Sequence, residues 1–223
     1  MREIVFDTET TGFDPKSGDR LVEIGCVELV NLMPTGNFLH KYVNPEREVP
    51  EAAAQIHGLT TEFLKDHPVF SEIISEFIEF IGDSSLVAHN AEFDMRFINW
   101  ELENAGHKAI PPSRFIDTLQ IARSRFPGAP NNLDALCKRL GVDNSSRTKH
   151  GALLDSEILA EVYLELKGGK QAGLELVQKS QKTRQTTGKK ERAPRSFPPS
   201  KEELEAHEKF ISKIDAPIWL KQS

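Results

Sequence analysis

Residues 4–12 read IVFDTETTG, and this short stretch joins a buried strand to two acidic residues. Residues 4–6 form the apolar run of a strand, and Asp7 and Glu9 follow at once. Because side chains alternate along a strand with period two, the two carboxylates point to the same face and repel each other. The stretch therefore predicts that a positive charge binds between them.

The sequence around this stretch predicts a layered α/β or α+β domain over roughly residues 1–168. Residues 2–9 read as a strand, and residues 10–19, rich in Thr, Gly, Pro and Asp, read as a loop. Residues 20–30 and 38–44 read as two further strands. The N-terminal part is therefore expected to be a meander of three strands.

Helical periodicity takes over from residue 70. An amphipathic helix is predicted from an apolar stripe at helical spacing, formed by Phe70, Ile74, Phe77, Ile78 and Ile81. The segments that follow are a short buried strand at 84–89, a helix capped by Asn90, a strand end running into a helix at 114–126, a helix stopped by Gly141, and a long helix at 151–169. This alternation of strands and helices favours a sheet with helices packed on it.

Composition indicates one domain with an appendage. The 223 residues, 38% of them hydrophobic, can bury one substantial core and leave sequence over. The two cysteines, Cys26 and Cys137, are far apart in the sequence, which argues against a disulfide framework and a structural zinc site. No stretch has the length of a membrane span or the pattern of a signal peptide, so we expect a cytoplasmic protein with no membrane partner.

Charge is divided unevenly along the chain. From residue 170 onward there are 12 Lys or Arg against 7 Asp or Glu, whereas residues 1–169 carry 16 against 27. An acidic body of this kind does not offer the broad basic patch that is usual in nucleic-acid binders. If this body handles phosphates, we expect it to do so through bound cations.

The C-terminal part is expected to be a disordered linker followed by a docking segment. Residues 177–197 are polar and basic with very few aliphatic side chains, a composition typical of disordered linkers. Structure is expected to return in residues 198–223, where Ser200 and Glu203 have capping-box spacing ahead of the apolar residues Leu204, Phe210, Ile211 and Ile214. So short a helix cannot bury its apolar side alone, which predicts a flexible tail that binds a partner.

Two further acidic residues lie beside apolar helical positions. Asp94, in AHNAEFD, and Asp155, in HGALLDSEIL, each fall on a predicted helix, where an unpaired carboxylate would be costly to bury. Taken alone, Asp7 and Glu9 could equally be two solvated carboxylates at a strand edge. Together with Asp94 and Asp155 they predict four carboxylates around a pair of Mg²⁺ or Mn²⁺ ions, which prefer oxygen ligands and bridge to phosphates.

His150 precedes Asp155 by five residues. On one continuous helix the two side chains would be rotated about 140° apart, so His150 is expected in the loop ahead of the helix. From that loop it can take a proton from an attacking water, because histidine ordinarily titrates near neutrality. The alternative is a surface histidine in a flexible loop, and the four spaced carboxylates favour the general base.

Three motifs resemble, in order and spacing, those of the DEDDh exonuclease superfamily. They are FDTETTG at residues 6–12, AHNAEFD at 88–94 and HGALLDSEILAEVYL at 150–164. Within the superfamily they are most similar to the DnaQ-like epsilon (proofreading) subunits of bacterial DNA polymerase III. The resemblance covers residues 1–176, and a weaker likeness continues into the tail.

The resemblance implies a ribonuclease-H-like fold, with a mixed five-stranded sheet flanked by helices, and a metal-dependent 3′–5′ exonuclease. It places Asp7, Glu9 and Asp155 around one metal ion. Asp7 is shared with a second ion, which Asp94 supports partly through water. His150 takes the position of the general base, which completes a catalytic set of four acids and one histidine.

The same resemblance implies which residues hold the terminal nucleotide, namely Thr8, Glu9, Thr10, Ile56, His57 and Asp155. Glu51 matches a further nucleotide contact in the family. Its spacing to His57 is one residue longer than the family pattern, which puts that one assignment in doubt.

The implied partners are DNA 3′ ends and a polymerase. The exonuclease domain is expected at residues 1–176, the linker at 177–197, and the segment that binds the polymerase III catalytic (alpha) subunit at 198–223. The stretch QAGLEL at 171–176 resembles the peptides that bind sliding clamps, through Gln171, Leu174 and Leu176. The alternative for this stretch is a frayed end of the preceding helix.

Two other functions remain open at this point. Members of the superfamily with the same catalytic residues degrade RNA ends, so those residues do not choose between DNA and RNA. The second alternative is a mainly structural subunit that stabilises a polymerase, against which all five signature positions carry the expected residue types. The appendage favours the proofreading subunit, because a compact nuclease working alone has little need of it.

Overall fold

The computed structural model describes residues 1–147, 149–169 and 198–214. They belong to two compact units, Met1–Leu174 and Glu175–Ser223. The predicted linker, the predicted clamp-binding residues and residues 215–223 of the predicted docking segment lie outside the described residues. The division of the chain into three functional segments therefore stays a prediction.

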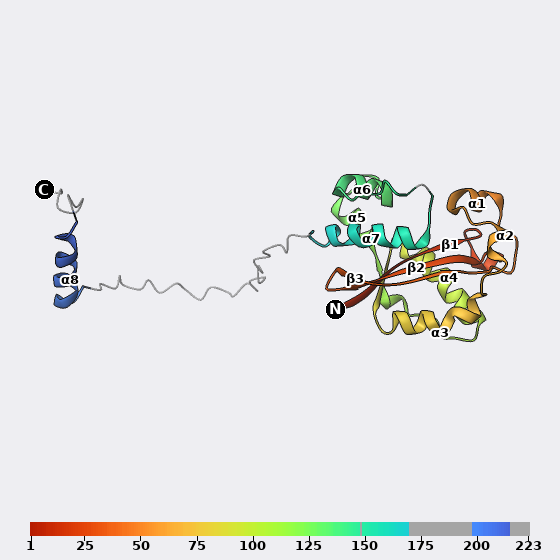
Figure 1. The fold of residues 1–223 in the computed structure, drawn as a ribbon, viewed down its shortest axis with the longest axis horizontal. Coiled ribbons are helices and arrows are strands. Elements are labelled where there is room, and N and C mark those ends of the chain that lie inside the picture. Colours follow the sequence, from red (N-terminus) through yellow and green to blue (C-terminus); the bar gives the residue numbers. More distant parts are fainter. Residues whose placement is uncertain (148, 170–197, 215–223) are drawn as a thin grey trace, which may run out of the picture. The chain divides into compact units, whose positions relative to one another are not determined.

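The first unit is built on a mixed five-stranded sheet with strand order β3-β2-β1-β4-β5 (Figure 1). Its strands are β1 (Arg2–Thr10), β2 (Leu21–Val30), β3 (Met33–Tyr42), β4 (Ser85–Ala88) and β5 (Phe115–Asp117). The first three strands form an antiparallel meander, whereas β4 pairs in parallel with both β1 and β5. Because β1 and β4 are parallel neighbours, their carboxyl ends lie at the same edge of the sheet.

Helices cover both faces of the sheet (Figure 1). On one face α3 (Phe70–Ile81) and α4 (Ala91–Asn104) pack against Ile4 and Phe6 of β1. On the other face α7 (Ala152–Leu166) lies over β1 and β2, with Tyr163 packed in the same cluster as Val5. Two shorter helices, α5 (Thr118–Arg125) and α6 (Leu133–Leu140), pack on α7. The predicted α/β layers and mixed five-stranded sheet are confirmed.

Some elements differ from those that the sequence pattern predicts. β3 begins at Met33 rather than at residue 38, because the first part of this edge strand is exposed and carries no alternating apolar pattern. Two short helices, α1 (Glu51–His57) and α2 (Thr61–Leu64), lack a recognisable apolar stripe. The loops also hold two single-turn 3₁₀ helices, Pro15–Ser17 and Pro112–Arg114.

Asn90 stands at the N-cap position of α4, but its side chain makes no capping hydrogen bond. Its backbone is in the left-handed region, with φ 68°, and its N–H donates to Asp117 Oδ1 at 3.0 Å. The predicted side-chain cap is therefore wrong. A carboxylate from the end of β5 holds the strand-to-helix turn instead.

The second unit contains α8 (Lys201–Ile211), the helix that Ser200 and Glu203 predict. The Glu203 N–H donates to Ser200 Oγ at 3.2 Å, and the Ser200 N–H donates to Glu203 Oε2 at 2.8 Å. The predicted capping box is therefore present. Neither α8 nor any other helix in the described residues is long and apolar enough to cross a membrane.

Candidate active site

Asp7 and Glu9 lie on the face of the sheet that α7 covers. Two earlier residues of β1 establish this face, because Tyr163 Oη donates to Glu3 Oε1 at 2.9 Å and Val5 packs in the same cluster as Tyr163. Alternation along the strand continues this row through the two acids. The carboxylates therefore share one face of the strand, as the sequence predicts.

A glycine lets α7 approach this row closely. Gly25 pairs with Asp7 across the β1–β2 ladder, and a Cβ added to Gly25 would collide with the first backbone units of α7. Ser156 of α7 stabilises this close contact between helix and strand, because its Oγ donates a hydrogen bond to Gly25 O at 2.9 Å. Asp155, which is 3% exposed, is thereby placed over the carboxyl end of β1.

Asp94 reaches the site from the opposite face of the sheet. It lies in the first turn of α4, is 2% exposed, and accepts a hydrogen bond at Oδ1 from Thr8 Oγ1 at 2.6 Å. Thr8 points to the α4 side because it alternates with Asp7 along β1. Carboxylates from both sides of the sheet thus meet at one strand end.

Asp7, Glu9 and Asp94 have raised pKa values, and burial is the main cause in each case. Burial raises the pKa of Asp7 well above its usual range, and three neighbouring carboxylates raise it further. Burial, followed by the charge of Glu23 and then by other carboxylates, raises the pKa of Glu9 to about 8. Burial likewise raises the pKa of Asp94 to about 7. A bound cation would offset this repulsion and allow all of the carboxylates to ionise together.

The donor atoms fit a divalent metal ion. Glu9, His150 and Asp155 each offer a ligand atom, and these atoms all lie within 4.8 Å of one another. Asp7 and Asp94 are not in this group, but Asp7 is near enough for Asp94, Glu9 and Asp155 to raise its pKa. Carboxylate oxygens are the ligands that hard cations such as Mg²⁺ and Mn²⁺ prefer.

A guanidinium group lies among these residues. Arg147 Nε donates to Asp155 Oδ1 at 2.5 Å, and Arg147 Nη2 donates to Asp155 Oδ2 at 2.7 Å. Nη2 also lies 2.8 Å from His150 Nδ1, and Nη1 donates to Asp134 Oδ1 at 2.7 Å. Burial acts to lower the pKa of Arg147, but its hydrogen bonds and ion pair with Asp155 raise it above the ordinary value.

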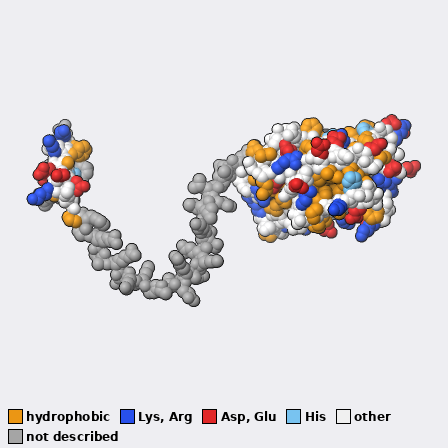
Figure 2. All heavy atoms as spheres, turned by 90° about the horizontal axis from the view of Figure 1, so that it is seen from below, with side chains coloured by type: hydrophobic (Ala, Val, Ile, Leu, Met, Phe, Trp, Pro, Cys, Tyr) orange, Lys and Arg blue, Asp and Glu red, His pale blue; other side chains and the backbone are white. Residues whose placement is uncertain are grey.

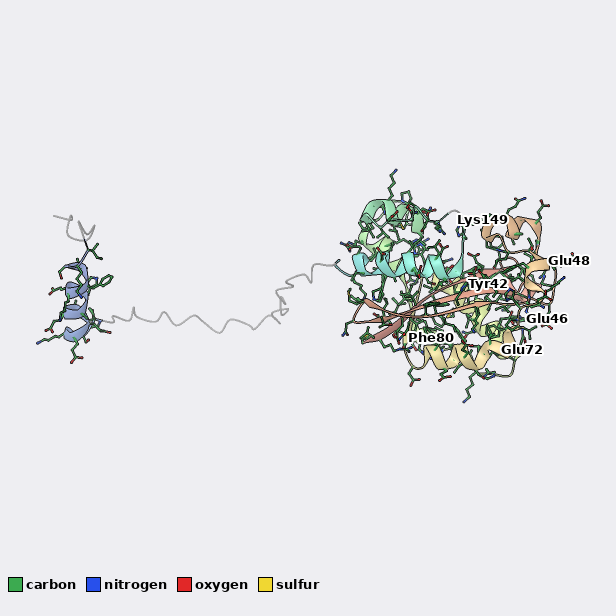
Figure 3. All side chains as sticks on the ribbon, in the orientation of Figure 1. Tyr42, Glu46, Glu48, Glu72, Phe80 and Lys149 are labelled. Atoms are coloured by element: carbon green, nitrogen blue, oxygen red, sulfur yellow. The ribbon has the colours of Figure 1, made fainter. Side chains whose placement is uncertain are left out.

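His150 lies in the loop before α7, as the sequence predicts, and its side chain is 49% exposed. Its backbone N–H donates to Ile56 O at 3.3 Å, which ties the loop to α1. Figure 3 labels the preceding residue, Lys149, in the region between α7 and α1.

A cavity of about 320 Å³ opens beside the acidic cluster, within the range of about 300–1,000 Å³ typical of small-ligand sites. It is formed by the end of β1, the loop after it, α1 and α4, and is lined by Thr8, Glu9, Thr10, Thr11, Gly12, Phe13, Pro50, Ala52, Ala53, Ile56, His57 and Phe93. All the predicted nucleotide contacts except Glu51 and Asp155 are among these residues. Glu51 is exposed at the start of α1, where its carboxylate accepts a hydrogen bond from Gln55 at 3.3 Å, and its role stays a prediction.

His57 gives this cavity a buried polar atom without a partner. Its Nδ1 accepts a hydrogen bond from the Leu59 N–H at 3.0 Å, which leaves the proton of the neutral imidazole on Nε2. Nε2 is buried and meets no partner with good hydrogen-bond geometry among the described residues, although the nearby backbone of Thr10 partly opposes the lowering of the His57 pKa by burial. An unpaired buried donor is costly, so this one fits an acceptor on a bound ligand.

Sequence reasoning does not find three features of the site. Arg147 lies in a polar loop where no pattern marks it. Glu23 is 3% exposed beside the β1 acids, and its Oε1 lies 2.7 Å from His40 Nε2. The position of Glu23 inside the apolar run LVEIGCVELV is the feature of the sequence that could have identified it. Phe13 and Phe93 become cavity walls only through the fold.

Comparison with known proteins places these features in a family. A family described as "Exonuclease" matches residues 4–163, the part of the chain that holds the acidic cluster, His150 and the cavity. The chain belongs to this exonuclease family. The exonuclease is 52% identical over 222 residues to the DNA polymerase III subunit epsilon of Rickettsia felis, covering 96% of this chain and 97% of that protein. It is 43% identical over 226 residues to the protein of the same name from Salmonella typhimurium, covering 96% and 93%. It is thus a DnaQ-like exonuclease of the epsilon type.

A solved structure supports the fold of this exonuclease. Exonuclease X in complex with 5′ overhanging duplex DNA matches with a TM-score of 0.59 at 27% identity, covering 74% of this chain and 90% of that chain. The predicted ribonuclease-H-like fold is confirmed. Exonucleases with this set of acids depend on divalent metal ions, in agreement with the donor set described above.

Proposed function

We propose that this exonuclease is the proofreading subunit of a bacterial DNA polymerase III and removes mismatched nucleotides from the 3′ ends of DNA. The observation that carries the proposal is that Glu9, His150 and Asp155 offer ligand atoms within 4.8 Å of one another, and that Glu9 also lines a cavity with four other predicted nucleotide contacts. The likeness to proteins named DNA polymerase III subunit epsilon covers 96% of the chain, so it extends beyond the nuclease domain.

The proposal assigns two Mg²⁺ or Mn²⁺ ions to the four carboxylates. Asp7, Glu9 and Asp155 would hold one ion, and Asp7 would share in holding the other, which Asp94 would support partly through water. When bound, such ions lower the pKa of the attacking water and stabilise the leaving 3′ oxygen of the DNA. Thr8 orients Asp94 for this task by holding one of its carboxylate oxygens.

His150 takes the proton of the attacking water at a ring nitrogen. Its side chain is 49% exposed, so it can pass the proton on to solvent. The terminal nucleotide occupies the neighbouring cavity, where His57 Nε2 donates a hydrogen bond to it. Ile56 and Phe13, which are 49% and 79% exposed, offer apolar contact to the base.

The surface charge of the nuclease domain is consistent with this use of cations. Figure 2 shows a face of the domain on which acidic and basic side chains are interspersed, with no single basic patch. A face without such a patch gains little from non-specific attraction to phosphates. Cations held by the carboxylates therefore supply the positive charge at the point of cleavage.

Two alternatives to proofreading would use the same fold. An exoribonuclease would use the same acids, but relatives that are 43% and 52% identical are named DNA polymerase III subunit epsilon. A mainly structural subunit would not need two acids and a histidine with ligand atoms within 4.8 Å of one another, beside a cavity of this kind. Both observations favour an active DNA exonuclease.

Binding partners are assigned to the tail and to the end of the nuclease domain. Residues 198–223 bind the polymerase catalytic (alpha) subunit. Within this segment, the side chains of Leu204 and Phe210 on α8 are 48% and 64% exposed. Gln171, Leu174 and Leu176 bind the sliding clamp, which titration of the clamp with a peptide of residues 168–180 and its Leu174→Ala, Leu176→Ala version would test. Both partners are cytoplasmic, and this exonuclease would act there.

The test of the proposed function is a comparison of substrates with Mg²⁺ present. The full chain should release mononucleotides from 3′-mismatched DNA faster than from matched DNA or short RNA. Asp7→Ala should abolish release because Asp7 is assigned to both ions, yet the variant should stay folded, since its removal relieves repulsion. Faster release from RNA would favour the exoribonuclease, and an active Asp7→Ala protein would overturn the two-ion assignment.

A further inference from the structure

One of the active site's own side chains lies across the acidic cluster. Arg147, whose side chain is 9% exposed, directs four of its N–H groups at the site and its rim. Two of them hold both oxygens of Asp155, at 2.5 and 2.7 Å. A third contacts the Nδ1 atom of His150, at 2.8 Å, and the fourth holds Asp134.

These contacts affect a metal ligand and the general base together. A guanidinium only donates, so His150 Nδ1 must accept, and the proton of the neutral imidazole is then on Nε2. Both ring nitrogens are thereby engaged, and His150 has no free lone pair for the proton of a water. Asp155, in turn, has both oxygens paired with a cation that is not a metal.

We propose that Arg147 is a latch that keeps the metal-free site inactive and must release Asp155 and His150 before metal ions and the general base can act. This inference rests on the function proposed above, since it takes Asp155 as a metal ligand and His150 as the base. In the latch, the single charge of the guanidinium stands in for the charge that the assigned ions would supply. It keeps the carboxylates together in the free protein.

Electrostatics explains why the latch is stable without metal and opens with it. Burial, and after it the other carboxylates, raise the pKa values of Asp7 and Glu9, and Arg147 lowers them, so its charge partly offsets the repulsion among the acids. A divalent ion at the same carboxylates places two positive charges beside the guanidinium and repels it. The ion and Arg147 therefore compete for Asp155.

Asp134 provides a place for the released side chain. It lies on α6, is 61% exposed, and receives Arg147 Nη1 at 2.7 Å. Asn144 Nδ2 also donates to Asp134 Oδ1, at 2.9 Å, which holds this carboxylate in place. Arg147 can thus turn away from Asp155 while it stays bound at the rim of the site, where its charge faces incoming phosphate.

The experiment is a calorimetric Mn²⁺ titration of the chelator-treated full chain, without DNA and at one pH. Arg147→Gln should bind Mn²⁺ about tenfold more tightly than the wild type, equivalent to about 1.4 kcal/mol. Without metal, Arg147→Gln should also melt at a lower temperature than the wild type. Addition of Mn²⁺ should raise its melting temperature by more than that of the wild type. Arg147→Lys keeps the charge but loses the bidentate contact with Asp155. Its Mn²⁺ affinity should lie between those of the wild type and Arg147→Gln.

The matched control is Lys138→Gln, which removes the same charge from an exposed position on α6 that has no hydrogen bond or ion pair in the described part of the chain. Its Mn²⁺ affinity should equal that of the wild type. Equal or weaker Mn²⁺ binding by Arg147→Gln would overturn the latch and leave the metal site standing. No Mn²⁺ binding by either protein would overturn the metal site and the latch together.

A second measurement needs no substitution at Arg147. The ring nitrogen resonances of His150 in the metal-free wild type, assigned by comparison with His150→Gln, should show the proton on Nε2 and an acceptor at Nδ1. Addition of Mg²⁺ should change this pattern as the guanidinium leaves. A proton on Nδ1 in the metal-free protein would overturn the latch.

Discussion

Glu9 illustrates how the fold forces acidic residues into an unfavourable protonation state. It is 9% exposed, and burial together with nearby carboxylates raises its pKa to about 8. The folded, metal-free protein therefore holds a proton on this cluster at pH values where the unfolded chain has lost it. Such a site costs stability unless cations occupy it, and this cost makes it ready to bind them.

A pH-dependent stability measurement tests this account of Glu9. Between its ordinary value of 4.5 and the raised value of about 8, the folded state binds more protons than the unfolded state, so stability falls as the pH rises. Glu9→Gln removes this titration while keeping the shape. With a chelator present, the free energy of unfolding measured in urea should be higher for Glu9→Gln than for the wild type. This difference should be larger at pH 8.5 than at pH 5. An equal gain at both values would contradict the raised pKa.

His150→Ala separates the roles of base and ligand. Loss of a general base typically slows a reaction by about 10²–10⁴-fold, so release of mononucleotides should fall by that factor. Mn²⁺ affinity should change by less than about threefold, because the carboxylates carry the binding. A loss of Mn²⁺ binding would instead make His150 a ligand, and an unchanged rate would remove it from the mechanism.

At the scale of the secondary-structure elements, the site depends on how closely α7 lies on β2. Gly25 allows this contact because its missing side chain leaves room for the backbone of Ala152 and Leu153. Ser156 then bonds to Gly25 O and sets the rotation of the helix. The position of Asp155 therefore follows from a residue in a different strand.

Gly25→Ala should push α7 away from the sheet. Overpacking of this kind costs about 1–3 kcal/mol of stability, and the shift of Asp155 should lower both Mn²⁺ affinity and nuclease activity. Gly151→Ala, at the start of the same helix, is the stability control because nothing lies within 4 Å of its added Cβ. Urea unfolding and Mn²⁺ titration of both variants measure the difference. A Gly25→Ala protein as stable and as active as the wild type would show that the helix can adjust.

Sequence patterns predict those elements whose burial follows a regular period. The stripe on α3 and the strand alternation in β1 and β2 have this property, and those elements are as predicted. α1 and α2 are too short for a period, and the exposed start of β3 carries none, so they are found only in the structure.

The acids and His150 are recognisable because their spacing reflects the chemistry of metal binding. Arg147 is different, because its role depends on contacts with Asp134 and Asp155. The sequence of the polar loop has no pattern that predicts these contacts. The same holds for Phe13 and for the Nε2 atom of His57. Only the structure shows that these two residues line the cavity.

At the scale of the whole molecule, the nuclease domain and α8 are separate units of one chain. If α8 and the residues after it bind the polymerase, the intervening segment acts as a tether. It raises the effective concentration of the nuclease near the primer end without fixing its orientation. Nuclease activity and polymerase binding should then be separable.

A chain that ends at Ser180 should keep nuclease activity on free DNA and fail to co-elute with the polymerase catalytic subunit. Phe210→Ala in the full chain removes an anchor that is 64% exposed in the free protein. It should weaken the complex by ~2 kcal/mol, about thirtyfold, whereas Glu205→Gln on the same helix should not. Co-elution of the shortened chain would locate the contact in the nuclease domain.

The acidic cluster joins β1, the first strand, to α7, which ends at Leu166. On the ribosome Asp7 is made early, but no cleavage site exists until Asp155 has emerged, so the growing chain cannot attack nucleic acid nearby. The segment proposed to bind the polymerase is translated after the nuclease domain. At 5–20 residues per second, residues 167–223 take roughly 3–11 s to synthesise. The nuclease domain can fold during this interval, so the order of translation is catalyst first and attachment second.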